Sequence, residues 1–242
     1  MHGDDLELRV AWLQYVSSSP AGTRSFDNVL ARHRQSHRHY HGVRHLRWVV
    51  RHALELIAAP RAGQTGASQT GASDAGVIVA AAFFHDVVYD ATRSDNEAAS
   101  ARVATRSLIE LGWEPDRVDR VASMILATAT HTSQPDDLDT AVLLAADLAV
   151  LAAEPSAYGD YVRGVRREYA HVSDTAWRAG RSGLLRGLLQ REHIYDPGLG
   201  LDRWELRARA NIAAELAELA AGTDETAVNG DESRGHDAEP AP

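Results

Sequence analysis

Apolar residues recur three or four positions apart along nearly the whole chain, and the alternating runs typical of strands are almost absent. This spacing places successive apolar side chains on one face of an α-helix. Aromatic residues make up only 6% of the chain, while alanine and leucine dominate it, which favours helix over sheet. We therefore expect an all-α fold. Its helices are predicted at residues 4–18, 24–34, 39–58, 75–89, 94–111, 115–130, 137–151, 155–171, 174–190 and 202–221.

Two segments depart from this pattern. Residues 64–68 and 69–73 both read Gln-Thr-Gly-Ala-Ser, and the surrounding segment, residues 60–76, has the Gly, Ser and Ala content of a flexible loop. Residues 222–242 are acidic, poor in apolar residues and end in Pro-Ala-Pro, which predicts a disordered tail. We therefore expect one helical domain, residues 1–221, followed by this tail.

The composition excludes several kinds of chemistry. There is no cysteine, so disulfides, thiolate metal sites and cysteine nucleophiles are excluded. There is no lysine either, which excludes a Schiff base and a P-loop lysine. A net charge of −9 argues against general nucleic-acid binding, and no apolar stretch reaches the length of a membrane span. With no signal-peptide pattern at the N-terminus, we expect a cytoplasmic protein without a nucleic-acid or membrane partner; its oligomeric state stays open.

Four polar residues interrupt segments that are otherwise apolar enough to be buried. His85 and Asp86 are adjacent in the run from Ala80 to Tyr89, Asp147 interrupts an apolar helix, and His45 lies in the predicted helix 39–58. A buried carboxylate is costly unless something pairs with it. Imidazole nitrogen and carboxylate oxygen are ligands that suit divalent metal ions, so we interpret these positions as a hydrolytic metal site.

Each of these residues also has a simpler explanation. A His-Asp dipeptide is weak evidence alone, and Asp147 could cap a turn or pair with an arginine. On a helix, the neighbours His85 and Asp86 point about 100° apart, so both reach one ion only if the helix passes close to it. The remaining lone histidines are expected to be surface or hydrogen-bonded residues: His33, His37, His39, His52, His171 and His193.

The order His45, His85-Asp86, Asp147 resembles the HD-domain superfamily of metal-dependent phosphohydrolases, and the surrounding sequence is closer still to a bacterial subfamily of predicted HD phosphohydrolases. The similarity covers about residues 8–220. One departure is Gly42, where Asn is expected, although this position is not a proposed ligand. The matching segments are Tyr40-His-Gly-x-x-His45, Ala82-Phe-Phe-His-Asp-x-x-Tyr-Asp90, Asn96-Glu-x-x-Ser100, Ile125-x-x-Thr-x-x-His131, Asp147-Leu-Ala-x-Leu151, Val165-Arg-Arg-Glu-Tyr169 and Gly180-Arg181.

This resemblance implies an HD-domain-like helical bundle in which His45, His85, Asp86 and Asp147 bind one divalent ion, of Mn, Fe, Co, Ni, Zn or Mg. It implies hydrolysis of a phosphate or pyrophosphate ester of a small molecule by metal-activated water, with a nucleotide as the expected substrate. Asp86 would also hold the attacking water. No base-binding motif supports the nucleotide, which comes from analogy with the superfamily.

Two acids after the His-Asp pair are candidate catalytic residues. Asp90 and Glu97 could act as general acid or base. Glu97 also lies three residues after Ser94, in the spacing of a helix capping box, and Asp90 could simply end its helix.

Candidate substrate-binding residues come from the histidines and arginines. His41 lies four residues before His45, on the same face if both are helical. His41 and His131 could bind a second metal, but a hydrogen bond to a ligand or a contact with the substrate phosphate is favoured. Arginine forks pair bidentately with phosphate, which makes Arg163 and Arg181 the chosen candidates, together with Arg166 and Arg167.

Two other functions stay open. In a non-catalytic metal- or nucleotide-binding regulator, the same ligands would only hold the fold together. In a di-iron HD-type oxygenase, His41 or His131 would have to bind a second ion. An open coordination position would favour the enzyme over the regulator.

Overall fold

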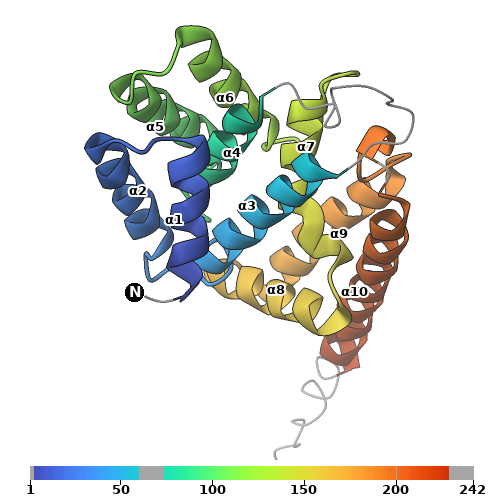
Figure 1. Cartoon of the computed structure of the whole chain (residues 1–242). Helices are drawn as coiled ribbons and strands as arrows, with labels where there is room; N and C mark the ends of the chain where they lie inside the picture. Colours follow the sequence, from blue (N-terminus) through green and yellow to red (C-terminus); the bar gives the residue numbers. More distant parts are fainter. Residues whose placement is uncertain (1–2, 60–73, 200, 229–242) are drawn as a thin grey trace, which may run out of the picture.

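The computed structural model describes residues 3–59, 74–199 and 201–228. These residues form ten α-helices, two 3₁₀ turns and no strand, which confirms the predicted all-α class (Figure 1). In chain order the elements are α1 (Gly3–Tyr15), α2 (Pro20–His33), α3 (Val43–Ala58), α4 (Ala75–Phe84), α5 (Asn96–Glu110), α6 (Pro115–Ala127), α7 (Leu138–Asp147), η1 (Leu148–Ala152), α8 (Pro155–Glu168), α9 (Asp174–Gln190), η2 (Pro197–Leu199) and α10 (Asp202–Val228).

Helix α4 lies at the centre of the molecule. Every residue from Val77 to Phe84 is buried, and the helix packs against α1, α3, α5, α6 and α7. A helix that is apolar on all sides is stable only when other elements surround it. The core formed in this way is continuous from Leu8 in α1 to Ile212 in α10.

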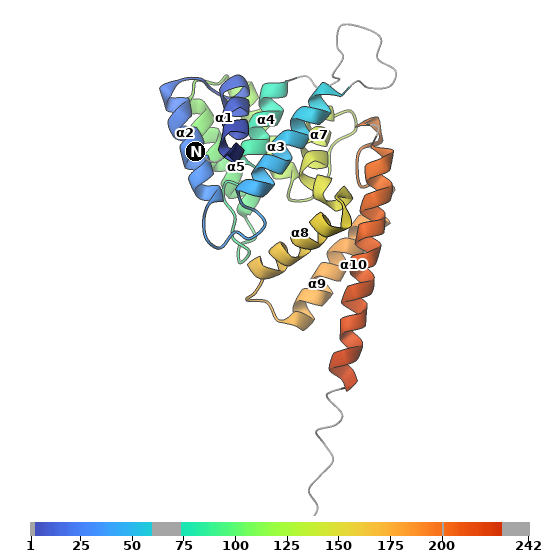
Figure 2. The same cartoon turned by 60° about the horizontal axis from the view of Figure 1, so that its bottom comes forward.

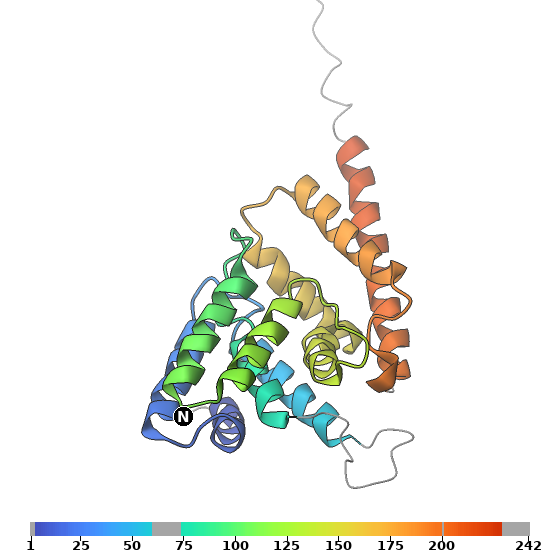
Figure 3. The same cartoon turned by 90° about the horizontal axis from the view of Figure 1, so that it is seen from above.

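Helices α3, α4 and α7 pack against one another and carry the residues of interest. Figures 1 and 2 show α1, α2 and α5 on one side of this central group and α8, α9 and α10 on the other. The turn η1 links the two sides, because it follows α7 directly and packs against α8 and α10. The view from above shows α9 and α10 side by side (Figure 3).

Two helices have ends that differ from the prediction in ways that matter for the site. Helix α3 begins at Val43, not at residue 39, with Gly42 in extended conformation at its N-cap. His41 therefore lies outside the helix and does not share a helical face with His45. Helix α4 ends at Phe84 instead of continuing to residue 89, so Asp86 lies in the turn that follows.

The predicted capping box of α5 was wrong. The helix begins at Asn96 with Asp95 at the N-cap, which makes no side-chain cap hydrogen bond. The reason is a local pair of hydrogen bonds: Asn96 Oδ1 accepts from the Asp90 backbone N–H at 3.1 Å, and Asn96 Nδ2 donates to the Asp90 carbonyl at 2.9 Å. They close the preceding turn, so that Ser94 is outside the helix and Glu97 is in its first turn.

The predicted loop and tail lie mostly outside the described residues, in 60–73 and 229–242. Within the described part, Asp74 caps α4 by accepting a hydrogen bond from the Val77 backbone N–H at 3.1 Å. Residues 222–228, assigned to the tail by the sequence, continue α10. Adding residues to an existing helix costs little compared with starting one, and no proline interrupts this segment.

No single helix of the described chain combines the length and the apolar composition needed to cross a membrane. One pair, Leu138–Ala152 with Pro155–Glu168, meets both criteria jointly and is bent by 105° at its break.

Candidate metal centre

Three helix ends bring the predicted ligands together. His45 lies in the first turn of α3, on the face that also buries Leu46 and Val49, and is 3% exposed. Asp147 is the last residue of α7, next to the turn η1. His85 follows α4 as its C-cap residue and is 1% exposed. The two histidines thus occupy buried positions, and Asp147 a partly buried one.

The end of α4 resolves the geometric difficulty that the sequence raised for the His-Asp pair. His85 keeps helical geometry, and its ring Nδ1 donates to the Ala82 carbonyl at 2.9 Å. Asp86 is in the turn after the helix, so the two side chains do not have to diverge as they would inside a helix. The His85 ring and the Asp86 carboxylate therefore both contact the ring of His45.

The two imidazole nitrogens lie within 3.6 Å of each other and of an oxygen of each carboxylate. His45 Nε2 lies 3.2 Å from His85 Nε2. Asp86 Oδ2 lies 3.3 Å from His45 Nε2 and 3.2 Å from His85 Nε2. Asp147 Oδ1 lies 3.3 Å from His45 Nε2 and 3.6 Å from His85 Nε2. Ligands of one ion at about 2.1 Å lie about 3.0–3.4 Å from one another. The buried group of His45, His85 and Asp147 could therefore hold a metal ion, with Asp86 beside it.

The two facing imidazoles need a proton or a metal ion between them. Because Nδ1 of His85 donates to a carbonyl, the Nε2 of the neutral ring carries a lone pair. Two nitrogen lone pairs 3.2 Å apart repel each other unless a proton or a metal ion lies between them. The two carboxylates would balance the charge of a divalent ion, and the mixed N and O donor set suits Fe, Mn, Co, Ni or Zn.

The ionisation of the four groups is strongly coupled. Burial alone would raise the pKa of Asp86 and Asp147, but the charge of His85 outweighs it and holds each pKa well below its ordinary value. Burial would lower the pKa of His45 and His85, but the two carboxylates raise both above their ordinary value. Metal binding at this group therefore competes with protons.

Arg38 holds the two segments that carry the ligands. This buried guanidinium donates to the carbonyls of His41 at 3.0 Å, Asp86 at 2.7 Å and Val87 at 3.3 Å. It thereby connects the segment before α3 to the turn that follows α4. Hydrogen bonds of this kind orient ligands and are as much a part of a metal site as the ligands themselves.

Glu168, at the end of α8, organises the segment before α3. Its Oε1 accepts backbone hydrogen bonds from His39, Tyr40 and His41 at 2.8, 2.7 and 2.9 Å. Its Oε2 accepts from His41 Nδ1 at 2.7 Å and from the Tyr89 hydroxyl at 3.0 Å. These contacts hold residues 39–41 in place before α3, and the extended backbone of Gly42 (φ −102°, ψ −163°) separates them from the helix.

The ring of His41 is fixed on two sides. Glu168 binds its Nδ1, and the ring of Tyr89 stacks on it with centroids 4.0 Å apart. No hydrogen bond joins its Nε2 to any described residue. His41 is thus held as a preorganised polar group next to the ligands, with a ring-centroid distance of 5.4 Å to His45.

Glu168 makes the stability of this segment sensitive to acid. Burial would raise its pKa, but the hydrogen bonds and charge of His41 and the backbone amides lower it from 4.5 to about 2. A carboxylate with a lowered folded-state pKa contributes stability that is complete above its unfolded pKa and is lost as the pH falls through the folded one. The lowering corresponds to about 3 kcal/mol.

We therefore expect Glu168→Gln to lower the free energy of unfolding by about 3 kcal/mol at pH 7 and to flatten its decline between about pH 4.5 and pH 2. Urea unfolding at several pH values, followed by far-UV circular dichroism, measures both effects. Glu110→Gln is the matched control, because Glu110 is exposed at the end of α5. Equal pH dependence in Glu168→Gln and wild type would contradict the assignment.

His131 approaches the same centre from the other side. It follows α6 with a φ of +49°, an uncommon conformation for a residue other than glycine, and its Nε2 lies 3.0 Å from Asp147 Oδ2. Arg191 supports this conformation by donating to the carbonyls of His131 at 2.7 Å and Thr130 at 2.9 Å. The two oxygens of Asp147 thus face different partners, the histidine pair and His131.

A cleft of about 760 Å³ opens beside the ligand cluster. Asp86, Asp147, His41 and His131 contribute to its lining, together with the first turn of α5 and residues of η1, α8 and α9. Its apolar part is formed by Leu148, Val150, Leu151, Val165, Leu184 and Leu188, and its aromatic part by Tyr40, Tyr89, Tyr161 and Tyr169. The candidate metal centre is therefore accessible from a cavity large enough for an organic molecule.

The structure separates the two acids proposed for catalysis. Glu97 lines the cleft. Asp90 does not line it, and accepts hydrogen bonds from the backbone N–H and the hydroxyl of Thr92 at 2.8 and 2.7 Å. Its carboxylate closes a turn with Thr92 and does not end a helix, because α4 already ends at Phe84.

The two arginines proposed for substrate binding also have different positions. Arg163 is exposed, pairs with Asp160 and does not line the cleft. Arg181 lines the cleft, but its guanidinium is held in a buried bidentate pair with Glu215, at 2.7 and 3.0 Å, and donates to the Tyr161 hydroxyl at 2.9 Å. Neither guanidinium is free to close on a phosphate without first leaving a carboxylate.

Sequence reasoning missed three residues that shape the site: Arg38, Glu168 and Arg191. A signal existed for Glu168, which lies seven residues after Tyr161 and three after Val165, on the buried face of α8. An acid at that spacing interrupts an apolar stripe just as Asp147 does. No comparable signal existed for Arg38 or Arg191, because both lie in segments without helical periodicity.

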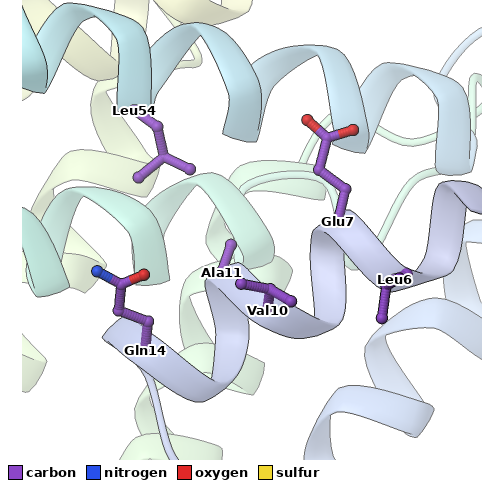
Figure 4. A pocket seen from close by; sticks show the side chains of 6 residues that line it. All are labelled: Leu6, Glu7, Val10, Ala11, Gln14 and Leu54. Atoms are coloured by element: carbon purple, nitrogen blue, oxygen red, sulfur yellow. The ribbon is translucent and has the colours of Figure 1, made fainter.

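A separate hollow of about 400 Å³ lies between α1 and α3 (Figure 4). Leu6, Val10, Ala11 and Leu54 make it mainly apolar, and its single charged residue, Glu7, pairs with an arginine on α3. It offers no set of metal-ligating groups.

Comparisons of the chain with protein-family models, with curated proteins and with solved structures gave no match.

Proposed function

We propose that the protein is a metal-dependent phosphohydrolase of the HD-domain type, which cleaves a phosphate or pyrophosphate ester of a small molecule. The observation that carries this proposal is the convergence of two imidazoles and a carboxylate oxygen of Asp147, with Asp86 beside them, on the wall of an organic-sized cleft. The order of these residues in the sequence, which resembles the HD superfamily, supports the same assignment.

His45, His85, Asp86 and Asp147 would hold the divalent ion. When bound, such an ion lowers the pKa of a coordinated water and neutralises charge on a phosphoryl group. Asp86 lines the cleft and is therefore placed to accept the proton of the attacking water. His131 and His41 line the same cleft and offer ring nitrogens to the phosphoryl oxygens, and each is held in position by a carboxylate.

The remaining lining of the cleft favours an organic leaving group. Leucines and valines of η1, α8 and α9 supply apolar surface, and four tyrosines supply flat aromatic surface. Glu97 lies in the cleft without a side-chain hydrogen bond to the described residues and could protonate a leaving oxygen. A nucleoside monophosphate fits this combination of phosphate, sugar and base.

The proposal predicts about one divalent ion per purified chain and release of phosphate or pyrophosphate from a panel of nucleotides supplied with Mn²⁺, Co²⁺, Ni²⁺ or Mg²⁺. Elemental analysis measures the metal, and colorimetric phosphate detection with and without pyrophosphatase separates the two products. Treatment with a chelator should stop the reaction, and adding back the metal should restore it.

Other outcomes would point elsewhere. Bound metal without any hydrolysis would favour a binding protein that only senses a ligand. Two irons per chain and no phosphate release would favour the oxygenase, with His131 as the nearest additional ligand, 3.0 Å from Asp147.

A further inference from the structure

Three arginines line the cleft beside the candidate metal centre. Because the chain contains no lysine, arginines supply every permanently charged basic side chain of this lining. Arg93 donates twice to Asp95, at 3.0 and 2.7 Å, and Arg181 is held by Glu215. The third, Arg191, forms no ion pair with any residue that the structure describes. Its charge is therefore the one guanidinium charge in the cleft that no described carboxylate compensates.

The guanidinium of Arg191 is oriented by backbone groups. It donates to the carbonyls of His131 at 2.7 Å and Thr130 at 2.9 Å. These bonds use two of the five N–H groups of a guanidinium and leave three for other acceptors. Carbonyl oxygens carry no net charge, so they fix the orientation of the group without neutralising it. A group oriented in advance loses little conformational entropy when it binds an anion.

The backbone of Arg191 is fixed as well. Its N–H donates to the Leu188 carbonyl at 3.2 Å, at the end of α9, and its carbonyl accepts a hydrogen bond from Arg209 Nη2 at 2.8 Å. Arg191 thus connects the end of α9 to the segment after α6, with both its backbone and its side chain constrained. The guanidinium therefore has a defined position in the cleft lining.

His131 lies between this guanidinium and the candidate metal centre. Its carbonyl accepts from Arg191, and its ring Nε2 lies 3.0 Å from Asp147 Oδ2. Arg191, His131 and Asp147 all line the same cleft. A phosphate group bound beside the ligands therefore shares the cleft with a guanidinium that has an uncompensated charge and unused donors.

We propose that Arg191 binds the phosphate group of the substrate, the role predicted from the sequence for Arg163 and Arg181. Its position in the cleft, its uncompensated charge and its orientation by two carbonyls carry this inference. A guanidinium binds phosphate oxygens through parallel hydrogen bonds that are strengthened by charge. The inference rests on the proposed function, since it concerns the substrate of the same cleft.

The first test is isothermal titration calorimetry of the purified full-length protein with inorganic phosphate. Arg191→Gln removes the charge but keeps an amide that can donate to a carbonyl, and it should weaken phosphate binding about tenfold or more at unchanged metal content. Arg186→Gln is the matched control, because Arg186 is exposed on α9 and does not line the cleft. Equal binding by Arg191→Gln and wild type, or no binding by wild type, would overturn the inference.

Steady-state kinetics separate substrate binding from a structural role. Losing a phosphate contact that is made both before and during the reaction should raise KM about tenfold and leave kcat nearly unchanged. If Arg191 only shapes the turn that carries His131, Arg191→Gln would lower kcat at constant KM and keep the phosphate affinity, against the inference. If wild type binds phosphate but hydrolyses no nucleotide, the proposed function fails, while the calorimetry still decides the role of Arg191.

A conservative variant covers the case in which Arg191→Gln does not fold. Arg191→Lys keeps the charge, but an ammonium group cannot form the two parallel hydrogen bonds of a guanidinium. Its phosphate affinity should fall several-fold while its metal content and thermal unfolding stay at wild-type values. Unchanged phosphate affinity in Arg191→Lys would contradict bidentate binding by this residue.

Discussion

Replacing Asp86 by Asn should remove bound metal and phosphate release together, with a fall in kcat/KM of about a thousandfold or more, equivalent to about 4 kcal/mol of transition-state stabilisation. Asn keeps the size of the side chain but removes its charge. The carboxylate lies 3.3 and 3.2 Å from the two ring nitrogens, so its loss leaves one carboxylate to balance a divalent ion. It also removes the group placed to accept a proton from water.

The measurement combines metal content, steady-state kinetics and thermal unfolding of the same preparation. Asp119→Asn is the control, since Asp119 is an exposed acid on α6 far from the ligands in sequence and outside the cleft lining. It should keep both metal and activity. Retained turnover in Asp86→Asn would contradict the metal mechanism, and loss of the fold would indicate that the metal has a structural role.

Most of the helices could be predicted from the sequence because apolar periodicity is a property of each segment by itself. Apolar periodicity located every α-helix of the described chain to within a few residues at most ends, and the polar residues that interrupt it led to His45, His85, Asp86 and Asp147. What these residues share is burial on a helix or at its end. That property is visible in a single segment and does not depend on knowing its neighbours.

The rest of the site depends on contacts between distant segments. Glu168 binds amides 127 to 129 residues earlier in the chain, and Arg38 binds carbonyls 48 and 49 residues later. These contacts hold the segment before α3 and the turn after α4. Periodicity predicted helix at residues 39–42 because it registers neither the extended backbone of Gly42 nor the hydrogen bond by which Arg38 occupies the His41 carbonyl.

Arg181 is a second case in which a contact with a distant segment decides the role of a residue. Its sequence context suggested a phosphate-binding residue, but the structure gives its guanidinium to Glu215, which is 4% exposed and comes from α10. The hydroxyls of Tyr158 and Tyr161 complete the group, at 2.5 Å from Glu215 Oε2 and 2.9 Å from Arg181 Nη1. This buried network joins α8, α9 and α10 behind the cleft.

We therefore expect Arg181→Met to lower the free energy of unfolding by about 3–5 kcal/mol, because it leaves the buried carboxylate of Glu215 without its cation. Met has a similar length and no charge, so the loss comes mainly from the unpaired acid and not from a cavity. Urea unfolding at pH 7, followed by far-UV circular dichroism, measures the change. Arg186→Met, an exposed position on the same helix, is the control and should change stability by less than about 0.5 kcal/mol.

A second variant separates this structural role from substrate binding. Arg181→Met/Glu215→Gln removes both charges, and the amide of Gln can still accept from the Tyr158 hydroxyl. It should be more stable than Arg181→Met alone, because no unpaired charge remains in the interior. If Arg181 instead serves the substrate, Arg181→Met would keep wild-type stability and raise KM, and the double variant would not differ from it. The comparison of the two variants therefore decides whether this arginine holds the three C-terminal helices together or holds a phosphate.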